Sequence, residues 1–327
     1  MSVTIDGGIT FTGGLTFVTN KFYLRNAIFI FGNNSGTACR ITNLVSDTGV
    51  VAADITYASA TARSYLAAAG YDFDKAIFGF GDTIATSYLA STNLVSNTGV
   101  VANDQAAVTG TGRDYLAAAT YGQDKAIFGF GSTGTATAVT NLVSNAGVVA
   151  TDTAGVGTAR IGLAATRYGI DKAIFGFGYN SSTSTFYSLT NLVSNTGVVA
   201  TDTTGVGTAR FGPAAAGYGT DKAIFGFGLT SGGASAVTSI TNLVSNTGVV
   251  ASDQAALTGT ARMRLGAATY GSDKAIFGFG DINNGSQGTI GRAMTNLVSN
   301  TGVVASDQAT ITGTARFALA AASYSSA

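Results

Sequence analysis

The residues of this chain that could perform chemistry are mainly its charged ones. The sequence has 17 acidic residues, all of them aspartate, and 17 lysines and arginines, with one cysteine and no histidine. Without histidine, the chain can form neither a nucleophilic triad that uses imidazole nor an ordinary zinc site. A carboxylate pair could still act as acid and base, and Asp82, Asp114 and Asp281 are available for one. Most other aspartates recur in an internal repeat, so we expect no enzyme activity, no metal and no cofactor.

The recurring charges form two sets, and we expect both to be structural. Each aspartate follows a Val-Val-Ala segment, and each arginine ends a Thr-Ala-Arg or Thr-Gly-Arg segment a short loop later. This spacing allows an ion pair within or between repeats. The alternative is a ring of arginines that faces a ligand. The aspartates are Asp54, Asp104, Asp152, Asp202, Asp253 and Asp307, and the arginines are Arg63, Arg113, Arg160, Arg210, Arg262 and Arg316.

The repeat is organised around the segment Asp-Lys-Ala-Ile-Phe-Gly-Phe-Gly. Five full copies lie about 50 residues apart, at 74–81, 124–131, 171–178, 221–228 and 273–280, and a degenerate copy lies at 26–32. The alternation predicts a strand with its alanine and both phenylalanines on one face, and its isoleucine and glycines on the other. Each phenylalanine is expected to fit against a glycine of the neighbouring copy.

Each unit contains four segments with strand character. An alanine-rich segment precedes the Phe-rich one, Thr-Asn-Leu-Val follows it, and Ser-Asn-Thr-Gly supplies a tight turn into Val-Val-Ala. Four strands in a unit of this length are typical of a β-propeller blade, with the alanine strand nearest the axis. We therefore predict an all-β fold, a six-bladed β-propeller of four-stranded antiparallel blades.

The last alanine strand, residues 316–324, has no Phe-rich strand after it. We expect it to pair with residues 26–32, so that the C-terminal strand closes the first blade. The alternative is that residues 14–22 supply this inner strand. The predicted regions are then an N-terminal β arm or degenerate strand (1–25) and the propeller (26–327). Strand-like alternation at 9–12 and 15–18 suits an arm that could pair with a sheet edge of another subunit.

The repeat resembles the kelch repeat over residues 26–324. The order Thr-Asn…Asp…Thr-Ala-Arg…Ala-Ala-x-Tyr-Gly-x-Asp-Lys-Ala-Ile-Phe-Gly-Phe-Gly carries this resemblance. Kelch units have an arginine before the inner strand and a Gly-Gly pair that closes the second strand. Here Gly-Phe-Gly replaces Gly-Gly, and the tryptophan of many kelch repeats is absent. The strong identity between copies also resembles repeat arrays in bacteriophage and environmental viral structural proteins, which implies a virion protein.

Composition argues against several classes of partner. The formal net charge of zero lacks the basic footprint of a nucleic-acid binder. No apolar run approaches the roughly 18 residues of a membrane helix, so we expect no membrane insertion. The first residues lack the features of a signal peptide, and the single cysteine, Cys39, excludes an internal disulfide. The expected location is the virion, after synthesis in the host cytoplasm.

The copies differ most between the Phe-rich segment and Thr-Asn-Leu-Val. In a propeller these variable loops emerge on the same face as the arginine-bearing loops, and function usually resides in variable loops on a rigid scaffold. The candidate binding residues there are Tyr88, Tyr179, Phe186, Tyr187 and Arg292.

Two functions follow as hypotheses. The first is a non-enzymatic structural or attachment protein of a virion, such as a tail, baseplate, fibre or capsid decoration protein. It would act through protein–protein contacts with other virion proteins or with copies of itself. The alternative is a lectin-like, carbohydrate-binding module, whose loop aromatics stack on host surface glycans.

Overall fold

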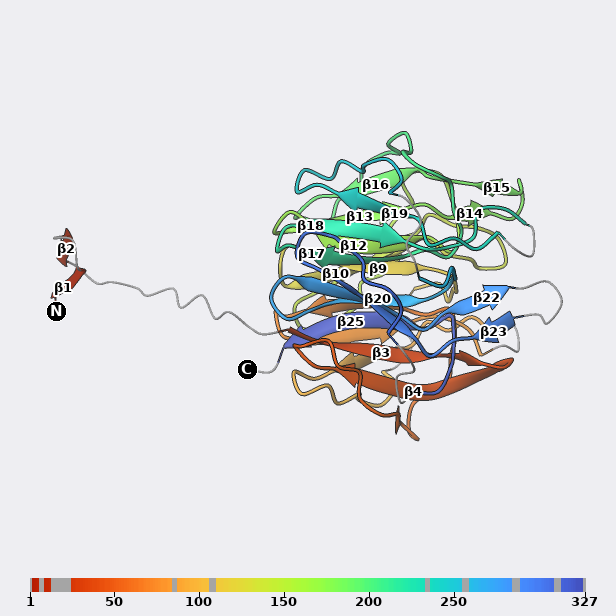
Figure 1. Ribbon diagram of the computed structural model, residues 1–327, viewed down its shortest axis with the longest axis horizontal. Helices are drawn as coiled ribbons and strands as arrows, with labels where there is room; N and C mark the ends of the chain where they lie inside the picture. The colour runs from red at the N-terminus through yellow and green to blue at the C-terminus, as the bar shows by residue number, and fades with distance from the viewer. Residues whose placement is uncertain are drawn as a thin grey trace.

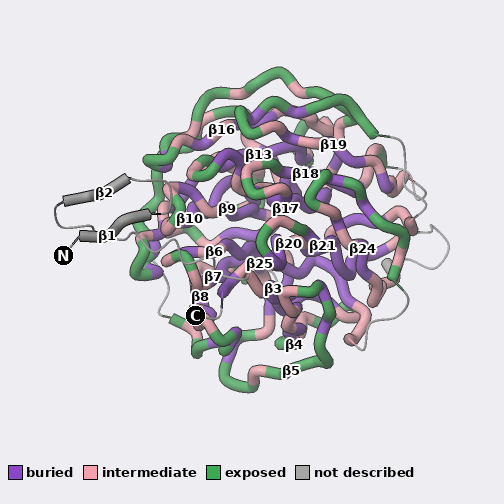
Figure 2. Tube along the Cα trace, turned by 60° about the vertical axis from the view of Figure 1, so that its left-hand side comes forward, coloured by how far each residue is buried: buried purple, intermediate pink, exposed green. Residues whose placement is uncertain are grey.

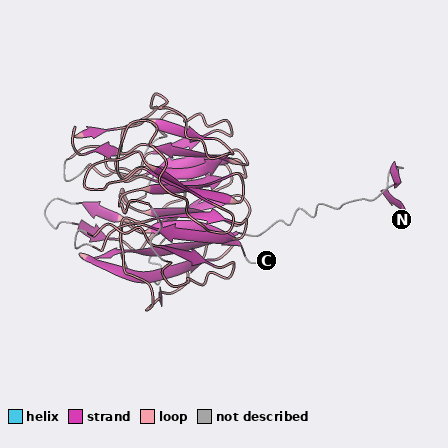
Figure 3. Ribbon diagram, turned by 180° about the vertical axis from the view of Figure 1, so that it is seen from behind, coloured by secondary structure: helices cyan, strands magenta, loops and turns pink. Residues whose placement is uncertain are grey.

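The computed structural model describes residues 2–5, 9–12, 25–83, 87–105, 110–232, 236–254, 259–283, 289–308 and 313–325. All regular elements in these residues are β-strands. The described residues therefore contain no helix that could cross a membrane. The strands form repeated small antiparallel sheets in a propeller-like arrangement (Figure 1, Figure 3). Ser2–Ile5 (β1) pairs with Ile9–Thr12 (β2). The strand predicted at 9–12 is therefore present, and the one predicted at 15–18 lies outside the described residues.

The main sheets each contain an inner strand, a Phe-rich strand and a Thr-Asn-Leu-Val strand, in that order. Sheet I consists of β25 (Ala320–Ser325), β3 (Arg25–Asn34), β4 (Thr37–Val45) and the short β5 (Ile55–Thr56). Sheet II consists of β6 (Ala67–Tyr71), β7 (Lys75–Gly79) and β8 (Thr92–Val95), and sheet III of β9 (Ala117–Tyr121), β10 (Lys125–Gly129) and β11 (Thr140–Val143). Sheet IV consists of β12 (Ala164–Tyr168), β13 (Lys172–Gly176) and β16 (Thr190–Val193), and sheet V of β17 (Ala214–Tyr218), β18 (Lys222–Gly226) and β19 (Thr241–Val244). Sheet VI consists of β20 (Gly266–Tyr270), β21 (Lys274–Gly278) and β24 (Thr295–Val298).

The fourth predicted strand of each unit is bulged rather than regular. In sheet III, Val149 faces Val143 and Thr153 faces Thr140, so the outer segment spans four steps where β11 spans three. This is a β-bulge of one residue. The side-chain amide of Asn141 fills it by donating to the Ala150 carbonyl at 3.0 Å. Four strands were predicted for each blade; in sheets II–VI three are regular strands, and the fourth segment pairs through isolated bridges, because an asparagine side chain replaces part of the backbone ladder.

The Phe-rich segment does not keep both phenylalanines on one face. In sheet IV, Phe175 packs against Phe130 of sheet III, whereas Phe177 packs against Phe225 of sheet V, with ring centroids 5.1 Å apart in both pairs. The strand ends at Gly176, and Phe177 adopts a φ of +63°, which turns its side chain to the opposite face. The alternation predicted for this segment was therefore wrong at its second phenylalanine, which serves the next interface instead.

Hydrophobic clusters fill the spaces between neighbouring sheets, and the buried residues lie in the interior in Figure 2. Glycines make room for the first phenylalanine of the neighbouring Phe-rich segment, and the prediction is confirmed for that phenylalanine. An ideal Cβ at Gly176 would lie 2.7 Å from the Phe225 ring, and one at Gly226 would lie 3.0 Å from the Phe277 ring. Because these glycines lack a side chain, adjacent sheets approach closely enough for the rings to pack.

The sheets contact one another in a repeating order. Inner strands are neighbours in the sequence β6, β9, β12, β17, β20, β25 and again β6. The N–H of the glycine that ends each Phe-rich segment donates to the carbonyl of the repeat arginine in the following sheet, and Gly280 of sheet VI donates to Arg316 of sheet I. β25 pairs with β3 from Ala320↔Ile30 to Ser325↔Arg25. Residues 14–22, the alternative inner strand, lie outside the described residues.

Candidate functional site

The repeat arginines lie in the interior, and all six are fully buried. In sheet IV, Arg160 Nη2 donates to Asn191 Oδ1 at 2.6 Å. Its Nε donates to the Phe177 carbonyl at 2.7 Å, and its Nη1 donates to the Thr158 carbonyl at 3.0 Å. The guanidinium also stacks on Phe130 of the preceding sheet, 4.4 Å from the ring centroid. Each of the six guanidinium groups donates to an asparagine of its own sheet and has no exposed surface, so the arginines do not form an open ring on the surface.

The recurring aspartates complete the same network. Asp202 accepts hydrogen bonds from the Thr158 N–H and hydroxyl and from the Asn191 amide, and its Oδ1 lies 3.7 Å from Arg160 Nη1. Burial alone would raise the pKa of Asp202, but these hydrogen bonds and the arginine charge outweigh it, so the pKa lies below its ordinary value. The pKa is lowered in the same way for Asp54, Asp104, Asp152, Asp253 and Asp307. The network ties the loop before the inner strand to the third strand and the outer segment.

A ring of six backbone hydrogen bonds surrounds one end of the molecule. The residues of this ring each lie two positions after a repeat arginine. The backbone N–H of each one donates to the carbonyl of the equivalent residue in the preceding sheet. The members are Tyr65, Tyr115, Gly162, Gly212, Arg264 and Ala318, all with φ between 50° and 64°. The variable loops begin here, since Ile161 and Tyr179 form a backbone bridge. We call this end the variable-loop mouth.

A row of aromatic rings crosses the variable-loop mouth. Tyr65 stacks on Tyr115 with centroids 3.9 Å apart, and Tyr115 lies 5.7 Å from Phe211. The ring centroids of Phe211 and Tyr179 are 6.1 Å apart, and those of Tyr179 and Phe186 are 4.7 Å apart. The last two rings belong to the hairpin of β14 (Tyr179–Asn180) and β15 (Thr185–Phe186), which projects at the right of Figure 1. We call these five rings the aromatic row; a cavity of about 90 Å³ lies beside its inner members.

An ion pair stands next to the aromatic row. Arg264 donates from Nε and Nη2 to the two carboxylate oxygens of Asp281, at 2.9 and 2.6 Å, and from Nη1 to the Tyr65 hydroxyl at 3.0 Å. Burial alone would lower the pKa of Arg264, but the bonds to Asp281 outweigh it and raise the pKa above the ordinary arginine value. Asp281 lies at the start of β22 (Asp281–Asn283), which pairs with β23 (Thr289–Gly291). The bidentate pair therefore fixes a charged, directional group beside the rings.

The three aspartates considered for acid–base chemistry do not form one cluster. Asp281 is held by Arg264, whereas Asp114 is buried near Asp82. Burial, and secondly the charge of Asp82, raise the pKa of Asp114 to about 7. Its Oδ1 has no hydrogen-bond partner, and Asp82 accepts a bond from the Ser64 hydroxyl at 2.7 Å. Among the described residues, no group of three or more histidine, cysteine and acidic side chains could hold a metal.

The structure places only two of the five predicted binding residues together. Tyr179 and Phe186 belong to the aromatic row. Tyr88 is partly exposed and forms a bridge with Asp82, and the Tyr187 N–H donates to the Gly178 carbonyl. Arg292 forms a backbone bridge with the buried Arg316. All five follow the Phe-rich segments, but only the first two are joined by ring contacts.

Sequence reasoning missed four members of the site: Tyr65, Tyr115, Phe211 and Arg264. They stand one or two positions after the repeat arginine, in a segment that looks constant because the arginine and the alanines around it recur. The signal that could have found them is the pair directly after each arginine. It reads Ser-Tyr, Asp-Tyr, Ile-Gly, Phe-Gly, Met-Arg and Phe-Ala in the successive copies. No two copies have the same pair, and such variation in an otherwise uniform repeat indicates residues with different roles.

Comparison with known proteins supports the fold alone. No protein-family model matches the sequence, and no curated protein matches it. A solved structure described as the structure of YjhT is similar, with a TM-score of 0.54 and 14% sequence identity, covering 73% of this chain and 82% of that one. At this identity the similarity concerns the all-β, propeller-like architecture of repeated small sheets.

Proposed function

We propose that the chain is a six-bladed, kelch-like β-propeller closed by its C-terminal strand. Three observations support this. Inner-strand contacts run from β6 through β20 to β25 and back to β6. The pairing of β25 with β3 gives sheet I the inner strand that the chain order does not provide. The backbone hydrogen bonds of the variable-loop mouth return to their starting residue, since Tyr65 donates to Ala318 and Ala318 donates to Arg264.

On this scaffold we propose a non-enzymatic binding function, with carbohydrate as the ligand and the variable-loop mouth as the site. The aromatic row is the observation that carries this proposal. Sugar rings present apolar C–H faces that stack on aromatic side chains, and their hydroxyls need directional polar partners. Here Tyr115 and Tyr179 supply ring faces, and the guanidinium of Arg264, which the buried Asp281 holds in place, supplies a fixed polar group beside them. The repeat charges are used internally, which leaves this end as the chemically distinctive surface.

Glycan binding by the full chain tests the proposal. We expect a defined set of glycans to bind on a broad array, and Tyr179→Ala or Tyr115→Ala to weaken that binding about tenfold or more, as expected for loss of a stacked ring. Phe73→Ala is the matched control, because Phe73 is an aromatic residue with 57% exposure outside the mouth. Silence of the wild-type protein across the array, or equal losses in all three variants, would contradict carbohydrate recognition.

A structural or attachment role in a virion is the second candidate, and exposed valines favour it. The valine that follows the Ser-Asn-Thr-Gly turn (Ser-Asn-Ala-Gly in sheet III, Ser-Asp-Thr-Gly in sheet I) is 57–66% exposed in every sheet. These residues are Val50, Val100, Val148, Val198, Val249 and Val303. An apolar side chain repeated around the rim suits contacts with other virion proteins or with copies of this chain. Co-sedimentation with particles would favour this role, and a monodisperse monomer that never sediments with particles would contradict it.

A further inference from the structure

The inner strands enclose a second site, away from the variable-loop mouth. They line a cavity of about 70 Å³ at the end where each inner strand turns into its Phe-rich strand. Alanine is the commonest residue in the wall. The fourth position of each inner strand also lines it, and the residues there are Gly70, Thr120, Arg167, Gly217, Thr269 and Ser323. Five of the six are small, so Arg167 stands out as a large cation in a narrow space.

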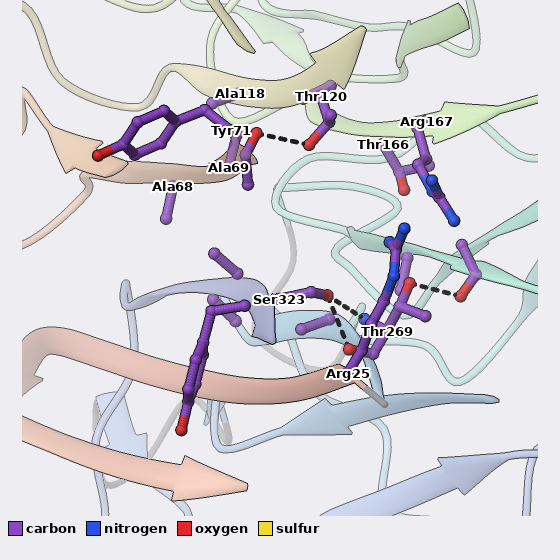
Figure 4. A pocket seen from close by; sticks show the side chains of 18 of the residues that line it. Arg25, Ala68, Ala69, Tyr71, Ala118, Thr120, Thr166, Arg167, Thr269 and Ser323 are labelled. Carbon is purple, nitrogen blue, oxygen red and sulfur yellow. Dashed lines mark hydrogen bonds between the residues drawn. The ribbon is translucent and has the colours of Figure 1, made fainter. Parts of the chain in front are cut away.

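Three hydroxyl groups of this wall donate to carbonyls of neighbouring sheets, whereas the buried hydroxyl of Ser325 has no hydrogen-bond partner. The Thr120 hydroxyl donates to the Gly70 carbonyl at 2.8 Å, and the Thr269 hydroxyl to the Gly217 carbonyl at 2.8 Å. The Ser323 hydroxyl donates to the Thr269 carbonyl at 2.7 Å. These bonds are drawn in Figure 4. None of the described residues that line the cavity is acidic, so the wall supplies no group to neutralise a cation.

A second cation, Arg25, enters the same cavity. Arg25 is the first residue of β3 and pairs with Ser325 of β25. In sheet II the residue equivalent to Arg25 is Asp74, and in sheets III–VI it is also an aspartate. In Figure 4 the Arg25 and Arg167 side chains extend into the cavity toward one another from opposite walls. Sheet I therefore carries a guanidinium where the other sheets carry a carboxylate, and this guanidinium lines the cavity together with Arg167.

Neither arginine has an acidic partner among the described residues. The nearby turn aspartates are engaged elsewhere, since Asp74 accepts from Asn97 and Asp273 pairs with Lys274. Burial, and then the charge of Arg25, lower the pKa of Arg167 to about 9. Two confined cations repel each other and are poorly solvated, which is unfavourable unless an anion joins them.

We propose that Arg25 and Arg167 together bind a small oxyanion, a phosphate or a carboxylate, in this cavity. Guanidinium groups match both anions through paired N–H donors. The cavity exceeds the ~15 Å³ needed for one water molecule and suits a group of several atoms. Because the cavity is separate from the aromatic row, this site is independent of the carbohydrate proposal.

Thermal unfolding and calorimetry of the full chain test the site with inorganic phosphate and, in a second arm, acetate. Sodium chloride at matched ionic strength is the reference in both. We expect phosphate or acetate to raise the Tm of the wild-type protein beyond this reference. Arg167→Thr should weaken binding at least about tenfold, as expected for loss of a charge-assisted hydrogen bond. This variant has a precedent in the fold, because Thr120 and Thr269 occupy the same position.

Arg25→Asp should have an effect on stability that loss of a purely structural arginine would not have. It restores the residue of the other copies and removes the second cation from the cavity, so it should raise the Tm without added anion and abolish the response to phosphate and acetate. Arg40→Gln is the control for charge, because Arg40 is exposed and bonded to the Ala58 carbonyl outside the cavity. No anion response in the wild type, or an equal response in Arg167→Thr, would overturn the proposal. A response to only one of the two anions would identify its class.

Discussion

At the scale of single residues, the surroundings of an aspartate decide its protonation. Asp202 receives hydrogen bonds from Thr158 and Asn191, and its pKa lies below the ordinary value. Asp114 is buried without a partner for Oδ1 and faces the charge of Asp82, and its pKa rises to about 7. The same side chain thus stabilises the fold as an anion in one place and as a neutral acid in another.

We predict that Asp114→Asn changes the pH dependence of stability. Between the unfolded pKa of 3.8 and the folded pKa of about 7, the folded chain holds a proton that the unfolded chain has released. Stability therefore falls as the pH rises through this window. An asparagine carries no charge, so the variant should lose this decline and gain at most about 4 kcal/mol at pH 8. Urea unfolding at pH 5 and pH 8 measures the effect.

Asp202→Asn is the control of opposite sign. Its lowered pKa gives stability that is present above pH 3.8 and lost as the pH falls toward the folded pKa. This variant should therefore be less stable than the wild type at pH 8 and lose its disadvantage in acid. If Asp114→Asn kept the wild-type decline between pH 5 and 8, the raised pKa of Asp114 would be refuted.

At the scale of elements, the interface between two sheets depends on a glycine facing a phenylalanine. Gly176 ends β13, and its missing Cβ makes the space into which Phe225 of sheet V fits. We predict that Gly176→Ala lowers the free energy of unfolding by about 1–3 kcal/mol, because the fully buried Phe225 ring must shift in a packed interior.

Gly232→Ala is the matched control for this prediction. A Cβ at Gly232 would meet nothing within 4 Å, and its φ is not in the left-handed region. Its free energy of unfolding should therefore stay unchanged or rise slightly. Urea unfolding of both variants decides the matter, and equal stabilities of the two would refute the role of the glycine hollow.

The strands themselves could be predicted from the sequence, but some of their details could not. Repeated alternation and turn residues locate the inner, Phe-rich and Thr-Asn-Leu-Val strands. The side chain of Phe177 points to the opposite face because its backbone is left-handed, and the alternation of apolar residues and glycines does not predict this conformation. The outer bulge depends on the side chain of Asn141 replacing ladder hydrogen bonds. At the site, the loop residues Tyr179 and Phe186 were predicted, whereas Tyr115 and Phe211 join them only through tertiary packing.

At the scale of the whole molecule, the two ends of the inner-strand assembly carry different chemistry. One end holds the aromatic row and the pair of Arg264 with Asp281, and the other holds Arg25 and Arg167. Most of the sequence between them is nearly identical from copy to copy and serves packing. The departures from the repeat are therefore concentrated where side chains reach open space. Such a division suits a rigid scaffold with two independent binding ends, if the first and last sheets are held together as firmly as the others.

The last prediction concerns that closure. β25 covers β3, whose Ile28 and Phe29 have no exposed surface. Deletion of residues 319–327 should expose them, lower the Tm by about 10 °C or more and cause self-association. Deletion of residues 1–24 should leave the Tm unchanged, because β25 already supplies the inner strand of sheet I. Thermal unfolding with size-exclusion chromatography compares the two deletions. A stable monomer after the C-terminal deletion, or collapse after the N-terminal one, would instead assign the inner strand to the first 24 residues.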